Sequence, residues 1–534
     1  MFPQCRDLPT AMLDQDGILQ TDIADIKSAA LKAYKFLLRN RKIKPGLEAL
    51  QQLKENVCNL RLKKSQRNKT QDWTIEDLDI VLSHLKKDAS RDPYGYANEI
   101  FDPKVAGDDL KKALLSLMNE IKDKQVFPQT LQSCNITSIW KRKGPKNNFE
   151  SYRGIFRITV FRNILDRLIY NDEYPKIDSY LSDCNVGGRK GRNVRDNIFV
   201  LNAVMNSISK GNKEPHDVQV YDLIQCFDSM WLKECINSLY EAGLDNDRLN
   251  LLYLSNASAQ VAVKTAGGIS ERNTIYNIVM QGTVWGNIFC VALLDKLGKY
   301  VYENPDLLYY YKQCVPIPPL EMVDDVLAIQ KCGPPSIRVN TAINTFMEAE
   351  KLTLSDSKCH VIHVGSKWEN CNELKVHNNK MHDTSNEKYL GDVINKSGTQ
   401  RATIQARKHK GFGTVSQIVA IVNEAPLGRW RMRSGMLLRS SMLINSMLFN
   451  SEAWHGIVKD DVQILSRVYE SLLRTLITAH SKTPKEALYF ESGQIPIQFI
   501  WASRQLNFLQ TILKEAQMRK LRKSMKPKNM IQKR

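Results

Sequence analysis

Three aspartates in this chain of 534 residues lie in segments that are otherwise apolar. Asp222 stands within DVQVYDLIQCFDSMW, whose residues Val218, Val220 and Leu223 predict a buried β-strand that passes into a helix. Desolvating a carboxylate there is costly unless a cation compensates it. For one aspartate alone, an internal ion pair with a lysine or arginine is the ordinary explanation, and a bound metal ion is the alternative.

A second segment favours the metal ion. The stretch PPLEMVDDVLAIQ carries adjacent aspartates, Asp324 and Asp325, between two apolar runs. Its simplest geometry is a tight β-hairpin with both carboxylates at the turn. Two neighbouring like charges repel each other unless a divalent cation binds them. Together with Asp222 they predict a site of three carboxylates, and such hard oxygen ligands suit Mg²⁺.

Helices are predicted on the N-terminal side of these aspartates. Residues 20–70 combine helical periodicity with many lysines and arginines, in IKSAALKAYKFLLRNRKIK and NLRLKKSQRNK. This pattern suits either a nucleic-acid-facing extension or a solvated charged face. Thr74 can cap a helix with Asp77 near its first turn, and a second helix is predicted from Asp108 or Asp109 to a point before Pro128. The expected inward positions of these two helices are Leu78, Val81, Leu82, Leu85, Leu110, Ala113, Leu114, Leu117 and Ile121.

Strand and helix signals alternate in the rest of the chain. The run NITSIWKRKG alternates like a β-strand and ends in the cations Lys141, Arg142 and Lys143 at a Gly-Pro turn, an arrangement suited to gripping phosphate. Residues 285–297 predict a helix. After Gly391 the chain is expected to be largely helical and basic. The apolar face expected there consists of Leu437, Leu438, Met442, Leu443 and Met447.

The overall charge favours a polyanionic partner. Lys and Arg number 76 against 57 Asp and Glu, which gives a net charge of +19 at pH 7. Charge alone is equally consistent with a merely soluble basic protein. The basic end MRKLRKSMKPKNMIQKR predicts a nuclear-localisation signal, a nucleic-acid tail or a frayed solvated terminus.

The cysteines and the apolar runs indicate the cellular compartment of the protein. The eleven cysteines are scattered, without C-x-x-C pairs or the spacing of a disulfide framework or a structural zinc site, and we interpret them as reduced thiols. The N-terminus lacks the pattern of a secretory signal, and no stretch of about 18 uninterrupted apolar residues occurs. We therefore expect an intracellular protein of nucleus and cytoplasm with no membrane partner.

Several segments together resemble one family. FESYRGIF, GGRKGRNVRDN, YDLIQCFDSM, MQGTVWGNIFCVALLDKLG, LEMVDDVL, LSDSKCHVIHVG and KYLGDVI follow the order of the polymerase motifs in reverse transcriptases of non-LTR retrotransposons, and the chain resembles that family over roughly Trp73 to Ile512. ESLLRTLI and TPKEALYFESGQIPIQFI are similar to the thumb regions of Dong-type elements, which carry a restriction-like endonuclease downstream. No segment here resembles that endonuclease, so the expectation is a polymerase core.

The resemblance implies an α+β right-hand polymerase fold, with fingers, a palm holding an antiparallel sheet and a helical thumb. The expected domains are a basic helical N-terminal extension (1–72), a helical lead-in to the fingers (73–134), fingers and palm (135–394), and a helical thumb with a basic C-terminal tail (395–534). The implied activity is RNA-directed DNA synthesis from dNTPs, with an RNA template and a DNA primer or target as partners.

The resemblance also implies catalytic roles. Asp222 and Asp324 would bind two Mg²⁺ ions, with Mn²⁺ as an alternative, and Asp325 would support the same site more peripherally. The backbone carbonyl of Leu223 is a further candidate metal ligand. Lys358 matches a lysine that can protonate the leaving pyrophosphate, although a surface lysine is the commoner meaning of one Lys.

Other positions match residues that bind the nucleotide. Arg153 and the cations Lys141 and Lys143 match the segment that grips the triphosphate. Phe227 matches the bulky side chain that excludes a 2′-hydroxyl, and a core phenylalanine is its alternative reading. Gln281 and Gly282 match the contact to the nascent base pair, where the alternative for the glycine is an ordinary turn before a helix.

The template and primer are expected at two further places. Tyr389, Leu390 and Gly391 resemble the primer grip. The basic loop expected to follow template phosphates contains Arg189, Lys190, Arg192 and Arg195.

The chain departs from the family at two places. Met322 and Gly188 stand where many relatives have an aromatic residue, and Met322 stays apolar enough to pack beneath a primer, so altered fidelity or processivity is expected. Two other functions stay open. One is a catalytically silent nucleic-acid-binding relic, and the other is an RNA-templated RNA polymerase, which Phe227 disfavours.

Overall fold

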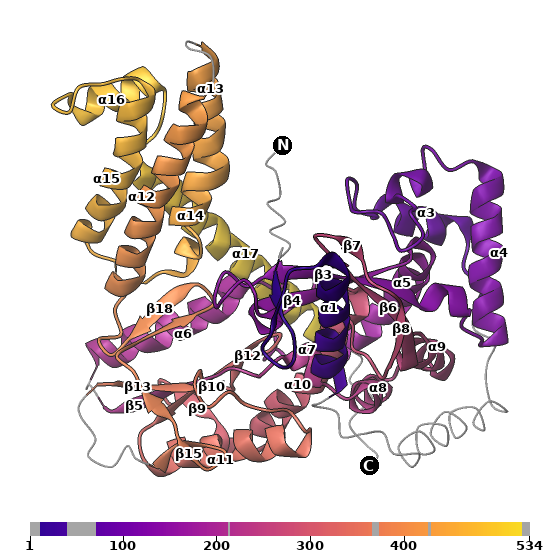
Figure 1. The fold of residues 1–534 in the computed structure, drawn as a ribbon. Coiled ribbons are helices and arrows are strands. Elements are labelled where there is room, and N and C mark those ends of the chain that lie inside the picture. Colours follow the sequence, from indigo (N-terminus) through magenta and orange to yellow (C-terminus); the bar gives the residue numbers. More distant parts are fainter. Residues whose placement is uncertain are drawn as a thin grey trace. The chain divides into compact units, whose positions relative to one another are not determined.

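The computed structural model describes residues 11–39, 71–211, 214–365, 373–424, 429–455 and 457–525. The basic run NLRLKKSQRNK and the last nine residues of the basic C-terminal stretch, 526–534, lie outside the described residues. The chain forms two compact units, each assembled from several segments. The first comprises 1–190, 222–305 and 341–355, and the second comprises 191–221, 306–340 and 356–534. Both combine helices with antiparallel or mixed sheets, so the chain is a mixed α and β protein (Figure 1).

The elements of the first unit, in chain order, are β1 (Met12–Leu13), β2 (Leu19–Gln20), α1 (Ile23–Arg39), α3 (Ile75–Ser83), η2 (Asn98–Phe101), α4 (Asp108–Lys124), η3 (Gln129–Gln132), β3 (Ser133–Trp140), η4 (Phe149–Ser151), β4 (Tyr152–Ile158), α5 (Val160–Tyr180), α7 (Cys226–Ser229), α8 (Leu232–Glu241), α9 (Asn246–Ala257), β6 (Ser258–Thr265), β7 (Gly268–Ile269), β8 (Asn273–Tyr276) and α10 (Val284–Glu303).

A five-stranded sheet forms the centre of the first unit. β3 pairs antiparallel with β4 and parallel with β6, which also pairs with β7 and β8. Helix α1 packs on this sheet through Ala29, Ala30 and Tyr34, and the Tyr34 hydroxyl lies 2.9 Å from Ser138 Oγ. The described part of the expected N-terminal extension, residues 11–39, therefore contributes to this core.

The two helices predicted at Thr74 and Asp108 are present. α3 begins with a capping box between Thr74 and Asp77, as its sequence predicts. α4 begins at Asp108 and ends at Lys124, and its buried side agrees only in part with the one expected, through Leu114 and Ile121. Leu110 and Ala113 are exposed, whereas the buried positions of α4 are Leu114, Met118, Ile121 and Lys122. Apolar periodicity alone was ambiguous in this leucine-rich helix, because several faces carry apolar residues.

The elements of the second unit, in chain order, are α6 (Val194–Lys210), β5 (His216–Tyr221), β9 (Tyr309–Tyr311), β10 (Val315–Ile317), β11 (Leu320–Met322), β12 (Asp325–Lys331), β13 (His360–Val364), β14 (Lys375–Val376), β15 (Asn379–Lys380), β16 (His382–Asp383), β17 (Asn386–Tyr389), β18 (Asp392–Asn395), α12 (Arg401–Asn423), α13 (Arg429–Leu438), the π-helical turn η7 (Arg439–Ile444), α14 (Asn445–Met447), η8 (Ser451–Ala453), α15 (Lys459–Leu476), α16 (Lys485–Ser492) and α17 (Ile497–Met525). Two elements, η5 (Pro305–Leu307) and α11 (Pro334–Ala349), cross the boundary between the units.

The sheet of the second unit has the strand order β11-β12-β5-β13-β16, and only its last pair is parallel. Every residue of β5 is buried. Because side chains alternate across a strand, Val218 and Val220 join the apolar cluster formed with α6, while Gln219 points to the other face and donates to Ser336 Oγ at 2.7 Å. The alternation VQV in the sequence is thus explained by two different buried faces.

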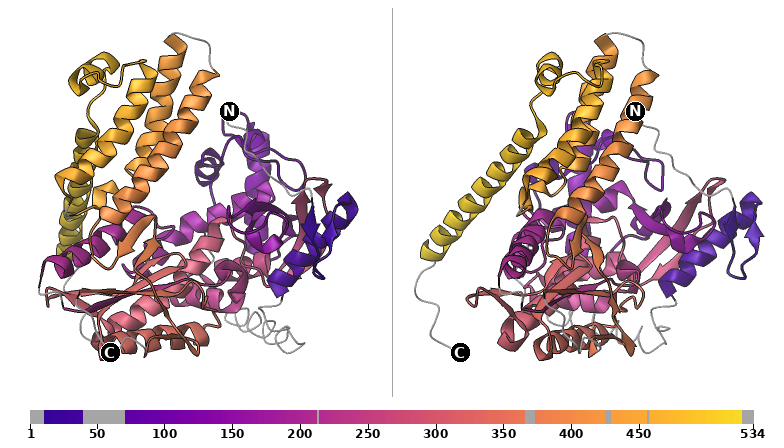
Figure 2. Two further views of the ribbon diagram at one scale, coloured as in Figure 1. Left: turned by 60° about the vertical axis from the view of Figure 1, so that its left-hand side comes forward. Right: turned by 90° about the vertical axis from the view of Figure 1, so that its left-hand side faces the viewer.

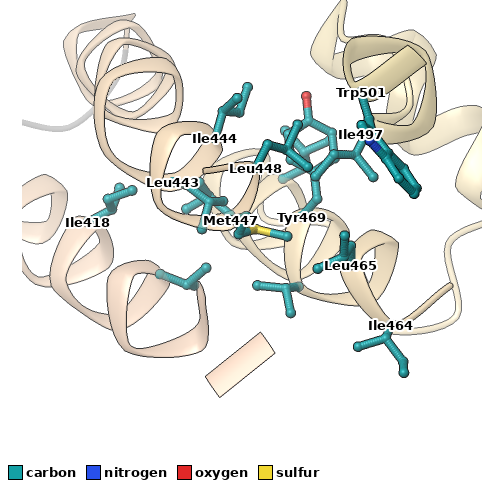
Figure 3. Close-up of a cluster of buried hydrophobic side chains, with 14 of the residues drawn as sticks. Ile418, Leu443, Ile444, Met447, Leu448, Ile464, Leu465, Tyr469, Ile497 and Trp501 are labelled. Atoms are coloured by element: carbon teal, nitrogen blue, oxygen red, sulfur yellow. The ribbon is translucent and has the colours of Figure 1, made fainter. Parts of the chain in front are cut away.

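A bundle of helices makes up the C-terminal part of the second unit. α12, α13 and α15 run side by side in both views of Figure 2, in orange and yellow. The core of the bundle also includes residues of α14 and α17: Met447, Leu465, Tyr469 and Trp501 lie together in it, as Figure 3 shows.

The apolar face expected across residues 437–447 is only partly correct. Leu443 and Met447 are completely buried, but Leu437 is 65% exposed. The π-helical turn η7 follows Leu437 and includes Leu443; it widens one turn by a residue, which rotates the apolar face relative to an ideal helix. A pattern with a period of 3.6 residues cannot anticipate such a turn.

We expect Leu465→Ala to lower the free energy of unfolding by about 2–5 kcal/mol, because the substitution leaves a cavity at a site that is 1% exposed. Urea unfolding followed by tryptophan fluorescence measures this loss, since Trp454 and Trp501 pack in the same cluster with ring centroids 5.8 Å apart. The matched control is Leu437→Ala, which should change stability by no more than about 0.5 kcal/mol. Equal losses in the two variants would contradict this assignment of the core.

Candidate active site

The two adjacent aspartates lie at the turn of a hairpin, as predicted. β11 and β12 pair antiparallel, with Met322 opposite Asp325, so that Val323 and Asp324 form the two-residue connection. Asp324 is half-buried and Asp325, the first residue of β12, is exposed. Val323 has φ of +59°, a conformation that is unfavourable for a β-branched side chain. Backbone strain of this kind is typical of positions held by their surroundings at functional sites.

Two hydrogen bonds hold the first strand of this hairpin in place. The Tyr389 hydroxyl donates to the Leu320 carbonyl oxygen at 2.9 Å, and Asn197 Nδ2 donates to the Glu321 carbonyl oxygen at 2.8 Å. Tyr389 is only 2% exposed. Burial, together with the charge of Asp325, holds the pKa of its hydroxyl well above the usual range, so Tyr389 stays a neutral donor. Its ring supports the hairpin from inside rather than facing solvent.

Asp222 belongs to the first unit. The structure corrects the prediction that it lies inside the strand, because β5 ends at Tyr221 and Asp222 follows it directly. The Ser355 amide donates to the Asp222 carbonyl oxygen at 2.9 Å, and the Ile224 amide donates to the Thr353 carbonyl oxygen at 2.8 Å. Leu223 lies between these two bonds, and its carbonyl takes part in neither.

The candidate phosphate-binding cations lie on the β3–β4 pair. Arg153 is the second residue of β4, lies opposite Ile139 of β3 and is exposed. Lys141 directs its ammonium to the Glu150 carbonyl oxygen at 2.8 Å, while Lys143 is exposed in the following turn. Arg153 therefore presents its guanidinium to solvent from a rigid strand, whereas the Lys141 side chain helps to close the connection.

Gln281 and Gly282 pack against the same strand that carries Arg153. The Phe156 amide donates to the Gln281 carbonyl oxygen at 3.0 Å. Gly282 has φ of +96°, and a Cβ atom there would lie 2.8 Å from Ile155 Cγ2. Glycine is required for both reasons, as in the alternative reading of a turn before a helix, and the contact with a nascent base pair stays a prediction. The helix predicted after it is present as α10.

We expect Gly282→Ala to lower the free energy of unfolding by about 1–3 kcal/mol, since it combines an unfavourable φ with a contact that β4 would have to relieve. Chemical denaturation measures the loss. Gly413→Ala is the matched control, because Gly413 lies in α12 with nothing within 4 Å of a Cβ, and alanine there should stabilise the helix by about 0.5–1 kcal/mol. A neutral Gly282→Ala variant would show that the approach to Ile155 is not tight.

Phe227 lies in the short helix α7, within five residues of Asp222 in the chain. Its side chain is half-buried, whereas its neighbour Cys226 is completely buried. Gln225, with φ of +45°, begins this helix and turns the chain sharply after the strand. The partial exposure of the ring leaves it able to contact a ligand while it packs on the first unit.

The structure changes the role expected of Arg189. Its side chain is buried, Nε donates to Asp178 Oδ1 at 2.9 Å, and Nη1 donates to the Asn185 carbonyl oxygen at 3.2 Å. This guanidinium holds the loop together, so we no longer assign it to template phosphates. Lys190 is exposed, with its ammonium 5.3 Å from the centre of the Tyr174 ring.

Arg192 and Arg195 belong to the second unit, where both are half-buried. The Arg195 guanidinium lies 3.9 Å from Glu452 and 5.2 Å from the centre of the Phe508 ring. Of the expected basic loop, Lys190, Arg192 and Arg195 therefore keep surface available for an anionic ligand.

The candidate general acid, Lys358, is exposed two residues before β13.

The segment expected to grip the primer is a tight turn. Tyr389 and Asp392 pair across it, and the intervening Leu390 and Gly391 both have positive φ, of 46° and 95°, as in a type I′ turn. Asn450 Nδ2 donates to the Leu390 carbonyl oxygen at 3.0 Å. The turn is thereby tied to the helical bundle of the second unit.

Asp392 anchors this turn and was missed by the sequence reasoning. It is buried and accepts hydrogen bonds from Trp454 Nε1 at 2.9 Å and from Arg407 Nη2 at 3.1 Å. Burial raises the pKa of this carboxyl group, and the charge of Arg407 opposes the rise. No local pattern could have found it, because its partners lie 15 and 62 residues further along the chain.

The chain is similar to many solved structures, among them two telomerases. The chain matches no protein-family model. It is similar to an apo telomerase from Candida tropicalis truncated of its C-terminal domain, with TM-score 0.36 and 13% identity over 53% of this chain and 59% of that one. It is also similar to a telomerase from Candida albicans in complex with a TWJ fragment of telomeric RNA, with TM-score 0.38 and 12% identity over 71% and 67%. With TM-scores below 0.5, these similarities establish neither fold nor activity.

In the described residues no helix has the length and apolarity needed to cross a membrane.

Proposed function

We propose that the chain is an RNA-directed DNA polymerase of the non-LTR retrotransposon type. The strand register of the second unit is the observation that carries this proposal. Tyr221 at the end of β5 pairs with Val326, the residue after Asp325. Asp222 follows Tyr221, and consecutive Cα atoms are about 3.8 Å apart. Covalent geometry therefore supports placing the Asp222 carboxylate at the same end of the strand pair as Asp324 and Asp325.

Three carboxylates and one carbonyl fit a divalent metal site. Asp222, Asp324 and the Leu223 carbonyl would hold two Mg²⁺ ions, with Asp325 in support, because hard oxygen ligands suit this ion. When bound, the ions supply activation of the primer 3′-hydroxyl and neutralisation of the triphosphate charge. The strained turn at Val323 fixes where Asp324 is presented. Mn²⁺ accepts the same ligands.

Four further positions would select and orient the nucleotide. Arg153 is exposed on a rigid strand and can pair its forked guanidinium with phosphate oxygens. Gln281 and Gly282, packed on that strand, would contact the nascent base pair. Phe227 would exclude a 2′-hydroxyl and so select dNTPs over rNTPs. Lys358 would protonate the leaving pyrophosphate as a general acid.

The template and primer would be held electrostatically and by the turn at Leu390 and Gly391. The net charge of +19 supports a nucleic-acid partner. Lys190, Arg192 and Arg195 are the cations we assign to template phosphates. In a right-hand arrangement the sheet of the first unit would form the fingers, the β5–β12–β13 sheet the palm, and the bundle of α12, α13 and α15 the thumb.

The proposal is tested by incorporation of dTTP on a poly(rA) template with an oligo(dT) primer and Mg²⁺. We expect extension that stops when EDTA removes the metal, and little extension when UTP replaces dTTP. A protein that binds the primer–template but extends it with neither nucleotide is the silent relic. Extension with UTP and not with dTTP would identify an RNA polymerase instead.

A further inference from the structure

Three potential metal ligands meet at the other end of strand β5. Asp217, Cys332 and His363 each offer one ligand atom, and these atoms all lie within 4.8 Å of one another. Cys332 Sγ lies 2.8 Å and His363 Nδ1 lies 2.6 Å from the same oxygen, Asp217 Oδ1. All three residues belong to the second unit. No role proposed above uses any of them.

The sheet register explains why these side chains converge. Asp217 on β5 is directly opposite His363 on β13 and opposite Gln330 on β12. Residues opposite each other point to the same face, and so do residues two apart in an extended chain, which places Cys332 on the face of Gln330. The Cys332 amide donates to the Pro215 carbonyl oxygen at 3.0 Å and holds the end of β12 in this position.

We propose that Asp217, Cys332 and His363 bind a Zn²⁺ ion. A thiolate, an imidazole nitrogen and a carboxylate form a mixed ligand set that suits Zn²⁺ and does not suit Mg²⁺, which prefers oxygen ligands alone. Three protein ligands leave the fourth tetrahedral position to water. Asp217 is 3% exposed, while Cys332 and His363 are half-buried, so the carboxylate is anchored and the other two ligands remain reachable from solvent.

Binding of Zn²⁺ at this site has to account for the protons of Cys332 and His363. Asp217 Oδ1 is shared by Cys332 Sγ and His363 Nδ1 through hydrogen bonds, which Zn²⁺ would replace. On binding, Zn²⁺ replaces the proton of the Cys332 thiol, which leaves to solvent. The His363 ring gives up the Nδ1 proton that it shares with Asp217 and takes a proton from solvent on Nε2, so that it coordinates through Nδ1 as a neutral ring.

This site is distinct from the three aspartates. Asp217 and Tyr221 are four residues apart on β5, which corresponds to about 13 Å along a strand. The ion would connect β5, the end of β12 and β13, the three central strands of the sheet. It would thus stabilise the strands that carry the aspartate hairpin without taking part in its chemistry, and the inference does not depend on polymerase activity.

The test is titration of the full-length protein, first stripped of metal by a chelator, with Co²⁺ as a spectroscopic substitute for Zn²⁺. Mg²⁺ is kept in excess so that oxygen-only sites are filled. We expect one equivalent of Co²⁺ to bind with a thiolate-to-metal charge-transfer band and tetrahedral d–d absorption, and Zn²⁺ to displace it. Cys332→Ser should abolish the charge-transfer band and weaken binding by at least about 100-fold, more than loss of an outer hydrogen bond does.

The matched control is Cys314→Ser, because Cys314 is an exposed free thiol of the same unit. Its spectrum should equal that of the parent protein. His363→Gln supplies a second variant in case Cys332→Ser does not fold, and it should also weaken Co²⁺ binding by at least about 100-fold. A charge-transfer band that survives unchanged in Cys332→Ser or His363→Gln, or its absence from the parent protein, would overturn the proposal.

Discussion

Asp324→Asn is expected to reduce dTTP incorporation on poly(rA)·oligo(dT) by at least about 1,000-fold. The substitution removes a charged metal ligand, and a loss of about 4 kcal/mol in transition-state stabilisation corresponds to that factor. Asparagine has nearly the shape of aspartate and is accepted in tight turns, so the hairpin at Val323 and Asp324 should persist. Steady-state primer extension measures the rate, and primer–template affinity should change little.

Two further carboxylate variants test whether the three aspartates contribute equally to the rate. Asp222→Asn should be as damaging as Asp324→Asn, whereas Asp325→Asn, at the more peripheral position, should cost about 10-fold. Asp306→Asn is the matched control, since Asp306 is exposed in the same unit and has no assigned role. If Asp324→Asn kept more than a tenth of the parent rate with its fold intact, the carboxylate site would be wrongly assigned.

Phe227→Ala is expected to raise the incorporation of UTP relative to dTTP by about 100-fold. Removing the ring makes room for a 2′-hydroxyl, and about 2.7 kcal/mol of lost discrimination corresponds to this factor. The measured quantity is the ratio of kcat/KM for the two nucleotides in the same preparation, so a change in the active fraction cancels.

The alternative role of Phe227 as a packing residue gives a different result. Its side chain is half-buried, so truncation can also lower stability. In that case both nucleotides would be used more slowly and their ratio would stay constant. Phe227→Tyr is the control, because it keeps the ring and should keep the discrimination. A constant ratio in Phe227→Ala would remove this residue from the nucleotide site.

Several local features of the structure could be predicted from the sequence because residues close together in the chain determine them. Thr74 and Asp77 are three residues apart and cap α3 by themselves. The apolar runs on both sides of Asp324 and Asp325 predict a hairpin, since a two-residue turn is the short way to pair them. The net positive charge likewise follows from the composition alone. The carboxylate candidates, the strand β3 and the helix α10 could therefore all be named from the residues alone.

Burial was predicted less well, because it depends on what each element packs against. Arg189 belongs to a basic run, and only the folded chain shows its guanidinium turned inward onto Asp178. The π-helical turn η7 exposes Leu437 where an ideal helix would bury it. In both cases the residue types leave open which way the side chain points, and the conformation and contacts of the folded chain decide it.

The sequence by itself therefore determined the charge, the caps, the hairpin and the candidate catalytic carboxylates. Tertiary structure alone decided which distant side chains meet. Asp217 and His363 are 146 residues apart, and Asp217 and Cys332 are 115 residues apart. Strand register brings them together, and register is set by the pairing of whole strands rather than by any residue spacing. The cysteine pattern accordingly predicted no zinc site, whereas the sheet brings three ligands to one face.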